Sequence, residues 1–362
     1  MNSQCTRSEA GNLELRQMTM RLMRGENLLR SEAANFLSAL LDPAATDAQV
    51  AGALTVLAAK GETVEELAGM AEAMRNRAIP VRSRHPRFID TAGTGSSAAK
   101  TFNVSTAAAF VIAGTGVPVA KHGSRAVTSD SGSADVLEAL GVNTACSPET
   151  VERCLNEHGI CFMFAPLFHE ATARVAHVRR ELGIRTTFNL LGPLTNPARA
   201  PFQILGVWHP SLLERVAAAL SLLGVEKAWV VHGADGLDEI TITDKTFVAA
   251  CLPSRSVETF AISPEDFGLK RQSLDGFGGS NARANAELIR SILEGEKTNQ
   301  KVAARDLVIV NAAAALHVTG FAHDLQEAAA FARESIDSGR AASKLEALIR
   351  ETNRADEQKF SL

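Results

Sequence analysis

Glycine, serine and threonine are concentrated in one short stretch of the chain, from Asp90 to Ser97. A cluster of hydroxyl and amide side chains, from Thr101 to Thr106, follows it and leads into a run of small apolar residues. Glycines beside the start of a helix let backbone N–H groups approach an anion closely, and hydroxyl groups and the positive helix end add further binding. These residues therefore indicate phosphate binding.

A second glycine-containing loop runs from Lys121 to Arg125 and continues into a hydroxyl-rich stretch from Thr128 to Ser133. Lys121 and Arg125 add two positive charges to the same glycine and hydroxyl chemistry. Two anion-binding loops suggest a substrate that carries more than one phosphate.

Residue spacing argues against a nucleotide-triphosphate P-loop at the first of these loops. That motif requires a glycine immediately before the lysine of Lys100-Thr101 and a second glycine five residues earlier. Ala99 and Thr94 occupy those positions, so the motif fails twice.

A dinucleotide-binding fingerprint matches the first loop better, because Gly93, Gly95 and Ala98 have its spacing between an expected strand and an expected helix. The fingerprint also requires an acidic residue near the end of the next strand, and that strand ends in Lys121. A glycine pattern of this kind is weak evidence on its own.

The first eighty or so residues are expected to be helical. Gly61 can end one helix at its C′ position, and Thr63 with Glu66 forms a capping box that starts the next. Apolar residues at helical spacing predict a small helical unit with helices at about residues 18–23, 33–41, 47–60 and 63–77.

From Arg87 onward, short β-rich runs alternate with helical segments, which predicts a mainly parallel sheet with helices on its faces. Ser133 is expected to cap a helix that ends before Gly141, and Ser147-Pro148 to open another that ends at Gly159. Gly-Pro and Asn-Pro turns are expected between Asn189 and Pro197. The expected strands are residues 88–91, 117–120, 160–164, 204–208 and 228–232, and further helices are expected at about 166–182, 281–293 and 303–318.

Length and composition describe an ordinary globular protein. A chain of 362 residues exceeds the usual size of one compact domain, so two structural units are expected. Hydrophobic residues make up 46% and charged residues 22%, which argues against long disorder. The net charge of 37 basic minus 41 acidic residues, −4, gives no field that would attract nucleic acid or an anionic membrane.

The five cysteines are odd in number and form no Cys-x-x-Cys pair, so we expect reduced thiols in a cytoplasmic protein and no cysteine metal site. The polar N-terminus lacks a signal-peptide pattern. The longest apolar run, around residues 107–120, is broken by glycines and a proline and is shorter than the roughly 18 residues of a membrane span. We therefore expect neither export nor membrane insertion.

The whole set of motifs resembles the anthranilate phosphoribosyltransferases, enzymes of tryptophan biosynthesis. The longest and most specific match runs from Gly183 to Pro197, and Gly278-Gly279, Asn281-Ala282 and Asn311-Ala312 extend the likeness. The resemblance covers nearly the whole chain from about residue 15. The other matching segments are residues 90–95, 101–106, 121–125, 131–142, 178–197 and 232–239.

This resemblance implies an α/β fold of the nucleoside phosphorylase and phosphoribosyltransferase type. A small all-helical domain at residues 1–84, joined by helices from about 166–182, would accompany a larger α/β domain at 85–362. It also implies an enzyme that joins the amine of anthranilate to C1 of phosphoribosyl pyrophosphate (PRPP), with Mg²⁺ as cofactor and release of pyrophosphate. Homodimerisation through the helical unit is implied as well, with no membrane or nucleic-acid partner.

The resemblance also assigns site residues, and no covalent nucleophile is among them, because such a reaction mainly needs positioning of the reactants and stabilisation of the leaving group. Mg²⁺ is matched by Ser105, Asp238 and Glu239. Anthranilate is matched by Gly93, Ser124, His169 and Arg179. PRPP is matched by Gly93, Thr94, Gly95, Ser96, Thr101, Asn103, Ser105, Thr106, Lys121 and Ser133.

The chain departs from the family pattern at three places. Residues 96–99 read Ser-Ser-Ala-Ala where the family usually has Gly-Gly-Asp-Gly; Ser124 replaces an asparagine, and Glu170 replaces a proline that often follows the site histidine. Three other functions stay open: a phosphoribosyltransferase with another aromatic acceptor, an enzyme like the pyrimidine nucleoside phosphorylases, and a non-catalytic or nucleic-acid-binding relative. The acidic pair argues against the second and the net charge against the third.

Overall fold

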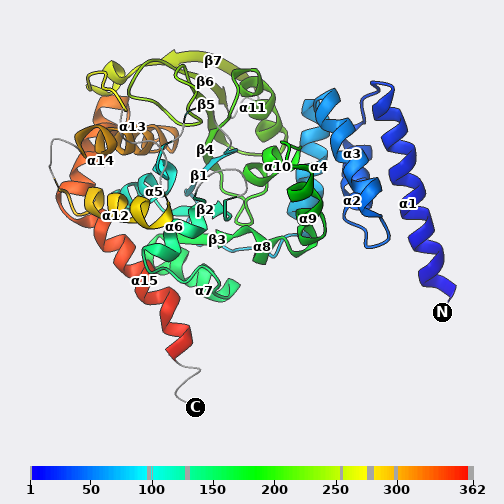
Figure 1. Cartoon of the computed structure of the whole chain (residues 1–362). Coiled ribbons are helices and arrows are strands. Elements are labelled where there is room, and N and C mark those ends of the chain that lie inside the picture. The colour runs from blue at the N-terminus through cyan, green and yellow to red at the C-terminus, as the bar shows by residue number, and fades with distance from the viewer. Residues whose placement is uncertain are drawn as a thin grey trace.

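Helices α1 to α4 form a bundle beside a larger α/β body in the computed structural model (Figure 1). It describes residues 2–95, 99, 101–126, 131–252, 256–274, 281–296 and 301–357, and side chains from residue 13 to residue 354 within these ranges. The predictions for Ser96 and for Gly278-Gly279 lie outside the described residues. The expected combination of a small helical domain and an α/β domain is confirmed.

The four helices of the bundle are α1 (Asn2–Met23), α2 (Arg30–Leu40), α3 (Asp47–Lys60) and α4 (Val64–Arg77). The capping box is present, since the Glu66 amide donates to Thr63 Oγ1 at 3.2 Å and the Thr63 amide donates to Glu66 Oε2 at 2.7 Å. Val175 and Val178 of α9 (Ala173–Leu182) share the apolar core of the bundle. The exact domain boundary at residues 84 and 85 stays a prediction.

A seven-stranded sheet in the order β3-β2-β1-β4-β5-β6-β7 forms the centre of the α/β body. The five predicted strands run parallel to one another, whereas β6 and β7 pair antiparallel and were not predicted. Four successive residues of β7 are exposed, so this strand lacks the alternating pattern that identifies a half-buried strand. The strands are β1 (Ile89–Gly93), β2 (Val119–Gly123), β3 (Ile160–Phe164), β4 (Phe202–Gly206), β5 (Lys227–Gly233), β6 (Thr246–Cys251) and β7 (Val257–Ile262).

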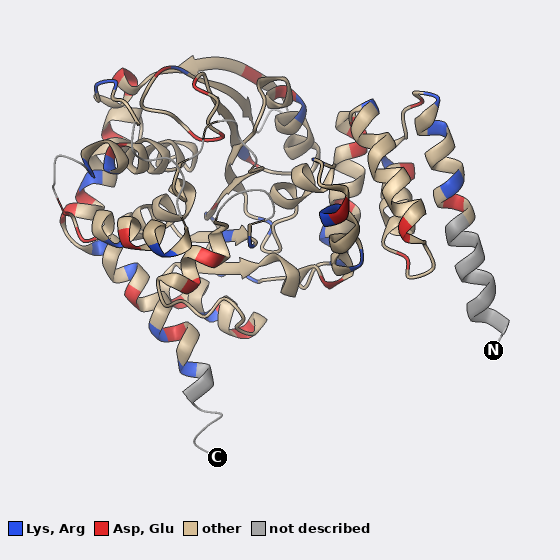
Figure 2. Cartoon of the chain, viewed as in Figure 1, with Lys and Arg blue, Asp and Glu red and all other residues tan. Residues whose placement is uncertain are grey.

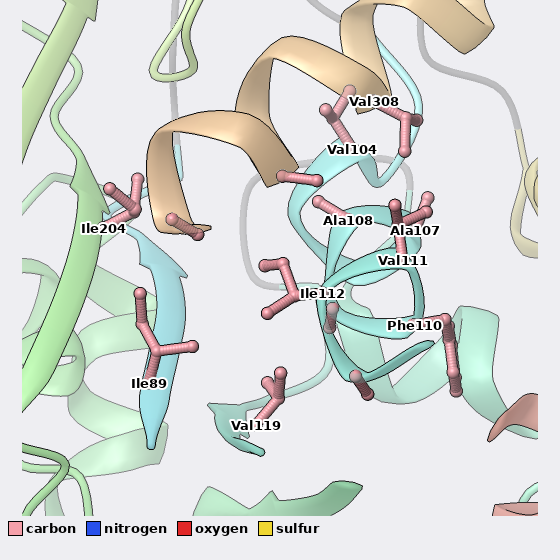
Figure 3. Packing of buried hydrophobic residues seen from close by; sticks show 14 of the residues in the cluster. Ile89, Val104, Ala107, Ala108, Phe110, Val111, Ile112, Val119, Ile204 and Val308 are labelled. Carbon is pink, nitrogen blue, oxygen red and sulfur yellow. The ribbon is translucent and has the colours of Figure 1, made fainter. Parts of the chain in front are cut away.

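Helices cover both faces of the sheet, and alternate residues of each strand belong to different cores. Trp229 and Val231 of β5 pack in the core that includes α5 (Val104–Thr115), whereas Ala228 and Val230 pack in the core shared with the helical bundle. Helix α5 is buried on nearly all sides: Figure 3 shows its apolar residues between the strand residues Ile89 and Val119 and the α13 residue Val308. The apolar run beginning at Ala107 therefore belongs to a helix packed against the sheet.

The remaining helices were only partly predicted: α11, α14 and α15 are additional, while α7, α12 and α13 match expected segments. Ser147 accepts the Thr150 amide and Asn281 the Ala284 amide, so both predicted starts carry a cap. These helices are α6 (Ser133–Ala139), α7 (Pro148–Arg153), α8 (Ala165–Phe168), α10 (Phe188–Leu194), α11 (Leu213–Leu222), α12 (Ala282–Leu293), α13 (Val302–Val318), α14 (Leu325–Asp337) and α15 (Arg340–Glu357), with short 3-10 or π turns at Cys154–His158, Glu170–Thr172, Pro210–Leu212 and Pro264–Phe267.

Three local predictions were wrong. Gly132 is the residue before α6 and Ser133 is its first helical residue, because the Asp135 side chain accepts the Gly132 amide. The expected Gly-Pro turn is part of helix α10, with Pro193 in its last turn, whereas the expected Asn-Pro turn is present, since the Arg199 amide donates to the Asn196 carbonyl at 3.0 Å. Lys121 and His122 lie inside β2 and not in a loop, since ladder bonds continue to Gly123.

Cys146, Cys154, Cys161 and Cys251 are buried and form no disulfide among the described residues. Burial raises the pKa of the Cys154 thiol to about 12, which keeps it protonated and inert. Within the part of the chain that the structure describes, no helix is both long and apolar enough to cross a membrane. Basic and acidic residues are interspersed over both domains (Figure 2).

Candidate active site

Thr94, Ser105, Lys121, Asp238 and Glu239 lie near the ends of the parallel strands, around the point where the chain order in the sheet reverses between β1 and β4. Ligands of open α/β sheets bind in the crevice at such a point. Thr94, directly after β1, donates from Oγ1 to the Gly206 carbonyl at 3.2 Å and accepts the Trp208 amide at 3.1 Å. These bonds hold the first loop against the end of β4.

Two glycines allow the acidic pair to approach these strand ends. A Cβ on Gly206 would overlap the backbone of Asp238, and a Cβ on Gly93 would lie 3.2 Å from Asp238 Oδ2. The loop after β5 therefore folds over β1 and β4, and it brings Asp238 beside Gly93 although 145 residues separate them in the sequence.

Glu239 lies against the first turn of α5. The Ser105 amide donates to Glu239 Oε1 at 3.3 Å, and Lys121 Nζ donates to Ser105 Oγ at 3.2 Å and to the Thr91 carbonyl. A helix N-terminus stabilises negative charge through its free amides and dipole. The sequence prediction that Ser105, Lys121 and the acidic pair act together therefore corresponds to a contiguous cluster in the fold.

Burial dominates the electrostatics of this cluster. Desolvation and the neighbouring Asp238 raise the pKa of the Glu239 carboxyl to about 8, while desolvation lowers the pKa of Lys121. Two adjacent carboxyl groups that repel each other in a desolvated site are stabilised by a shared cation. Their oxygens, with the Ser105 hydroxyl, are hard ligands of the kind that Mg²⁺ prefers, so the residues fit this ion.

Asn103 connects the cluster of hydroxyl and amide side chains at residues 101–106 to two other segments. Its Nδ2 donates to the Ser131 carbonyl at 3.2 Å, and its Oδ1 accepts Asn285 Nδ2 from α12 at 3.0 Å. The Oγ1 atoms of Thr101 and Thr106 are buried and have no hydrogen-bond partner among the described residues. Buried hydroxyls without partners are uncommon, and a bound polar ligand would satisfy them.

Gly95 follows β1 on the first loop, and Ser124 and Ser133 lie at the two ends of the second loop. Gly95 has φ of 64°, a left-handed conformation that favours glycine. Ser124 is exposed, and its carbonyl accepts Ser133 Oγ at 3.4 Å. The structure thus places Ser133 beside Ser124 at the base of the second loop.

A pair of neutral histidines lies on the other side of β2. Side chains alternate along a strand, so Lys121 faces α5 whereas His122 faces α10 and His169. The two rings are 5.1 Å apart, with Nδ1 of His122 near the Gly192 carbonyl (3.2 Å) and Nε2 of His169 near the Thr195 carbonyl (3.0 Å). Desolvation lowers the pKa of His122 to about 3 and that of His169 to about 4.

Arg179 lies on α9, and none of its described contacts reaches His169. Its guanidinium lies 5.2 Å above the Phe188 ring, and its Nη2 donates to Asn189 Oδ1 at 3.4 Å. Burial lowers its pKa from the usual value, yet arginine stays protonated in proteins. One long hydrogen bond leaves most of the guanidinium donors available for a carboxylate.

Comparison with known proteins identifies the family. Residues 85–342 match the Glycosyl transferase family, a/b domain, and residues 16–78 match the Glycosyl transferase family, helical bundle domain. The anthranilate phosphoribosyltransferase of Moorella thermoacetica is 50% identical over 335 residues, which cover 92% of this chain and 97% of that protein. The chain belongs to the anthranilate phosphoribosyltransferase family.

Solved structures of anthranilate phosphoribosyltransferases have the same fold. The enzyme from Thermus thermophilus is 40% identical with a TM-score of 0.85, over 92% of this chain and 99% of that one. The enzyme from Saccharomyces cerevisiae in complex with PRPP and Mg is 29% identical with a TM-score of 0.85, over 94% of this chain and 98% of that one.

Sequence reasoning missed two residues that organise the site of this anthranilate phosphoribosyltransferase family member. Asn285 interrupts the apolar stripe of α12, and a polar residue on such a stripe is a usable signal. Asp90 is fully buried and accepts the His122 amide at 3.2 Å and Asn196 Nδ2 at 2.7 Å. Its role depends on contacts across the sheet, which nothing local in the sequence indicates.

Proposed function

We propose that the chain transfers the phosphoribosyl group of PRPP to the amine of anthranilate, giving N-(5-phosphoribosyl)anthranilate and pyrophosphate, in tryptophan biosynthesis. One observation carries the proposal beyond family membership: the cluster of Lys121, Ser105, Glu239 and Asp238 at the crevice between β1 and β4. It combines a buried cation, a helix N-terminus and a carboxyl pair, the set that a metal diphosphate needs.

The donor half of the site is assigned to the two loops and the first turn of α5. Ser105, Asp238 and Glu239 would hold Mg²⁺, which neutralises phosphate charge when it is bound. Free hydroxyls, backbone amides and Lys121 Nζ contact the phosphates. The PRPP set is Gly93, Thr94, Gly95, Ser96, Thr101, Asn103, Ser105, Thr106, Lys121 and Ser133.

The chemical step needs charge stabilisation more than a reactive side chain. Positive charge develops on C1 of the ribose while negative charge develops on the departing pyrophosphate. Lys121 and the α5 amides stand beside that leaving group, and no side chain forms a covalent bond with the substrate. Fixing both reactants in one crevice accounts for much of the expected rate enhancement.

The acceptor half is assigned to Gly93, Ser124, His169 and Arg179. The Arg179 guanidinium pairs with the anthranilate carboxylate, since a planar fork matches that group. The His169 ring is neutral, and its Nδ1 is buried without a hydrogen-bond partner among the described residues. A neutral imidazole nitrogen can accept a hydrogen bond from the aromatic amine without adding positive charge.

The proposal also includes the place of action, the cytoplasm. It further includes a homodimer that forms through the helical bundle. The cysteine pattern supports the cytoplasm, and the family resemblance supports the homodimer. Sedimentation of the purified full chain tests the dimer.

Loss of anthranilate fluorescence with purified protein, PRPP and Mg²⁺ tests the function. We expect turnover that needs all three components and stops when EDTA removes the metal. Replacing anthranilate with other aromatic amines, or PRPP with a nucleoside and inorganic phosphate, tests the two alternative activities. Turnover in either replacement assay, without turnover of anthranilate, would reject the proposal.

A further inference from the structure

The two ends of the loop between β2 and α6 cross each other at its base. A Cβ on Gly132 would overlap the Ala126 amide nitrogen and lie 2.5 Å from the Arg125 carbonyl carbon and 2.6 Å from the Ser124 carbonyl oxygen. Only glycine permits this approach of one backbone segment to the other.

The carboxylate of Asp135 joins these two segments. Its Oδ2 accepts the Ala126 amide at 3.0 Å and the Gly132 amide at 2.9 Å, and its Oδ1 accepts Arg125 Nη1 at 3.0 Å. A capping box alone would involve only the Gly132 amide. The additional bonds to Ala126 and Arg125 close the loop and are not needed to start the helix.

The base of the second loop is connected to the 101–106 cluster, which follows the first phosphate loop. The carbonyl of Ser131, next to Gly132, accepts Asn103 Nδ2 at 3.2 Å, and Ser133 Oγ donates to the Ser124 carbonyl at 3.4 Å. Asn103 and Ser133 both belong to the proposed PRPP set. A change at Asp135 is thus transmitted to two groups of that set through one or two hydrogen bonds.

We infer that Asp135 is a positioning residue for PRPP: by joining Ala126 to Gly132 it holds these two backbone segments in place relative to Asn103 at the start of α5. The inference rests on the proposed function of this site. Asp135 itself touches no substrate. Its effect is greater on PRPP than on anthranilate because Asn103 and Ser133 are in the PRPP set, whereas only Ser124 is in the acceptor set.

Kinetics and calorimetry of matched variants test the inference. Asp135→Ala should raise the KM and Kd for PRPP with Mg²⁺ by about tenfold or more, because charge-assisted bonds to two amides are lost. The KM for anthranilate should change less. Asp135→Asn keeps an oxygen that can accept both amides, so it should restore most of the PRPP affinity. Gly132→Ala, which separates the same segments sterically, should reproduce the Asp135→Ala effect.

Glu138→Gln is the matched control. Glu138 accepts Arg125 Nη1 at 2.8 Å and Nη2 at 2.6 Å but neither loop amide, so this variant should keep the wild-type KM for PRPP. If Asp135→Ala and Gly132→Ala lower only the Tm and leave the KM for PRPP unchanged, Asp135 is merely structural and the inference fails. An inactive wild-type protein would instead reject the proposed function, and the inference with it. If Asp135→Ala does not fold, Gly132→Ala alone decides.

Discussion

Two clusters in this molecule each combine a lysine with a glutamate, and they differ in how many hydrogen bonds the glutamate accepts. In the helical bundle, Glu66 is fully buried and accepts the Leu28 amide (2.9 Å), the Thr63 amide (2.7 Å) and Lys60 Nζ (2.9 Å). In the α/β domain, Glu239 accepts one described hydrogen bond, the Ser105 amide at 3.3 Å. Lys121 is nearly as buried, and its described partners are oxygens of Thr91 and Ser105, not a carboxylate.

The difference separates a charge cluster that stabilises the fold from one that we propose to bind a ligand. A buried carboxylate with a cation and two amides is satisfied by the protein alone. Burial and then the neighbouring Asp238 raise the pKa of Glu239, so a further cation would stabilise this carboxyl pair. Both clusters contain one lysine and at least one glutamate, so residue type does not distinguish them, whereas the number of hydrogen bonds to the glutamate does.

The largest effect is expected for Glu66→Ala. It leaves the Leu28 and Thr63 amides without an acceptor and takes the carboxylate away from Lys60 Nζ, which keeps only Asn27 Oδ1 and the Gly61 carbonyl, so the free energy of unfolding should fall by about 3–5 kcal/mol. Urea denaturation measures this, and kcat per folded molecule should stay near wild type. Glu72→Ala removes an exposed ion pair with Arg30 and should cost less than about 1 kcal/mol. Equal losses in the two variants would contradict the comparison.

The double variant Asp238→Asn with Glu239→Gln should have the reverse phenotype. Removing two repelling groups should leave the Tm unchanged or higher, whereas turnover should fall by about a hundredfold or more because charge stabilisation is lost. Thermal unfolding and the fluorescence assay measure the two effects. Asp244→Asn, at an exposed partner of Arg271, is the control and should be active. A double variant that keeps wild-type turnover would place the metal site elsewhere.

Arg179→Ala extends the comparison to a positively charged side chain, whose guanidinium makes one long hydrogen bond among the described residues. Losing a charge-assisted bond to the anthranilate carboxylate should raise the KM for anthranilate by about 10- to 100-fold, or roughly 1.5–3 kcal/mol. The KM for PRPP should change much less. Equal changes in both constants would remove Arg179 from the acceptor site.

The smallest effect concerns the two neutral histidines. Burial lowers the pKa of His122 to about 3 and that of His169 to about 4, so the unfolded chain binds more protons than the folded chain below about pH 6.5. The free energy of unfolding should therefore fall on acidification, by about 2 kcal/mol per ring at pH 5. Asp90, with a pKa raised to about 6 by burial, acts in the opposite direction.

A comparison of variants isolates the imidazole contribution. Urea denaturation at pH 7 and pH 5 should show a smaller loss for His122→Gln than for the wild type. His209→Gln, at an exposed ring that contacts Ser211, should follow the wild-type profile. Identical profiles for wild type and His122→Gln would mean that the buried ring takes up a proton readily.

Features that depend on interactions between near neighbours in the chain could be predicted from the sequence. Thr63 with Glu66, Ser147 and Asn281 start helices through bonds that span three residues, and such pairs are visible in the sequence. The glycine and hydroxyl clusters near Gly93 indicated phosphate chemistry for the same reason, because an anion loop is built from consecutive residues.

The contacts between residues far apart in the chain became visible only in the tertiary structure. Ser105 and Glu239 are 134 positions apart, and their contact depends on β1 and β4 being neighbours in the sheet. Strand β7 likewise depends on its pairing with β6, and the bonds of Asp135 depend on the close approach of Ala126 and Gly132. Lys121 and His122 are adjacent in sequence, yet they serve opposite faces of β2 because side chains alternate along a strand. Glu66 accepts three hydrogen bonds and Glu239 accepts one among the described residues. This difference comes from the packing around each carboxylate, which the residue type does not specify.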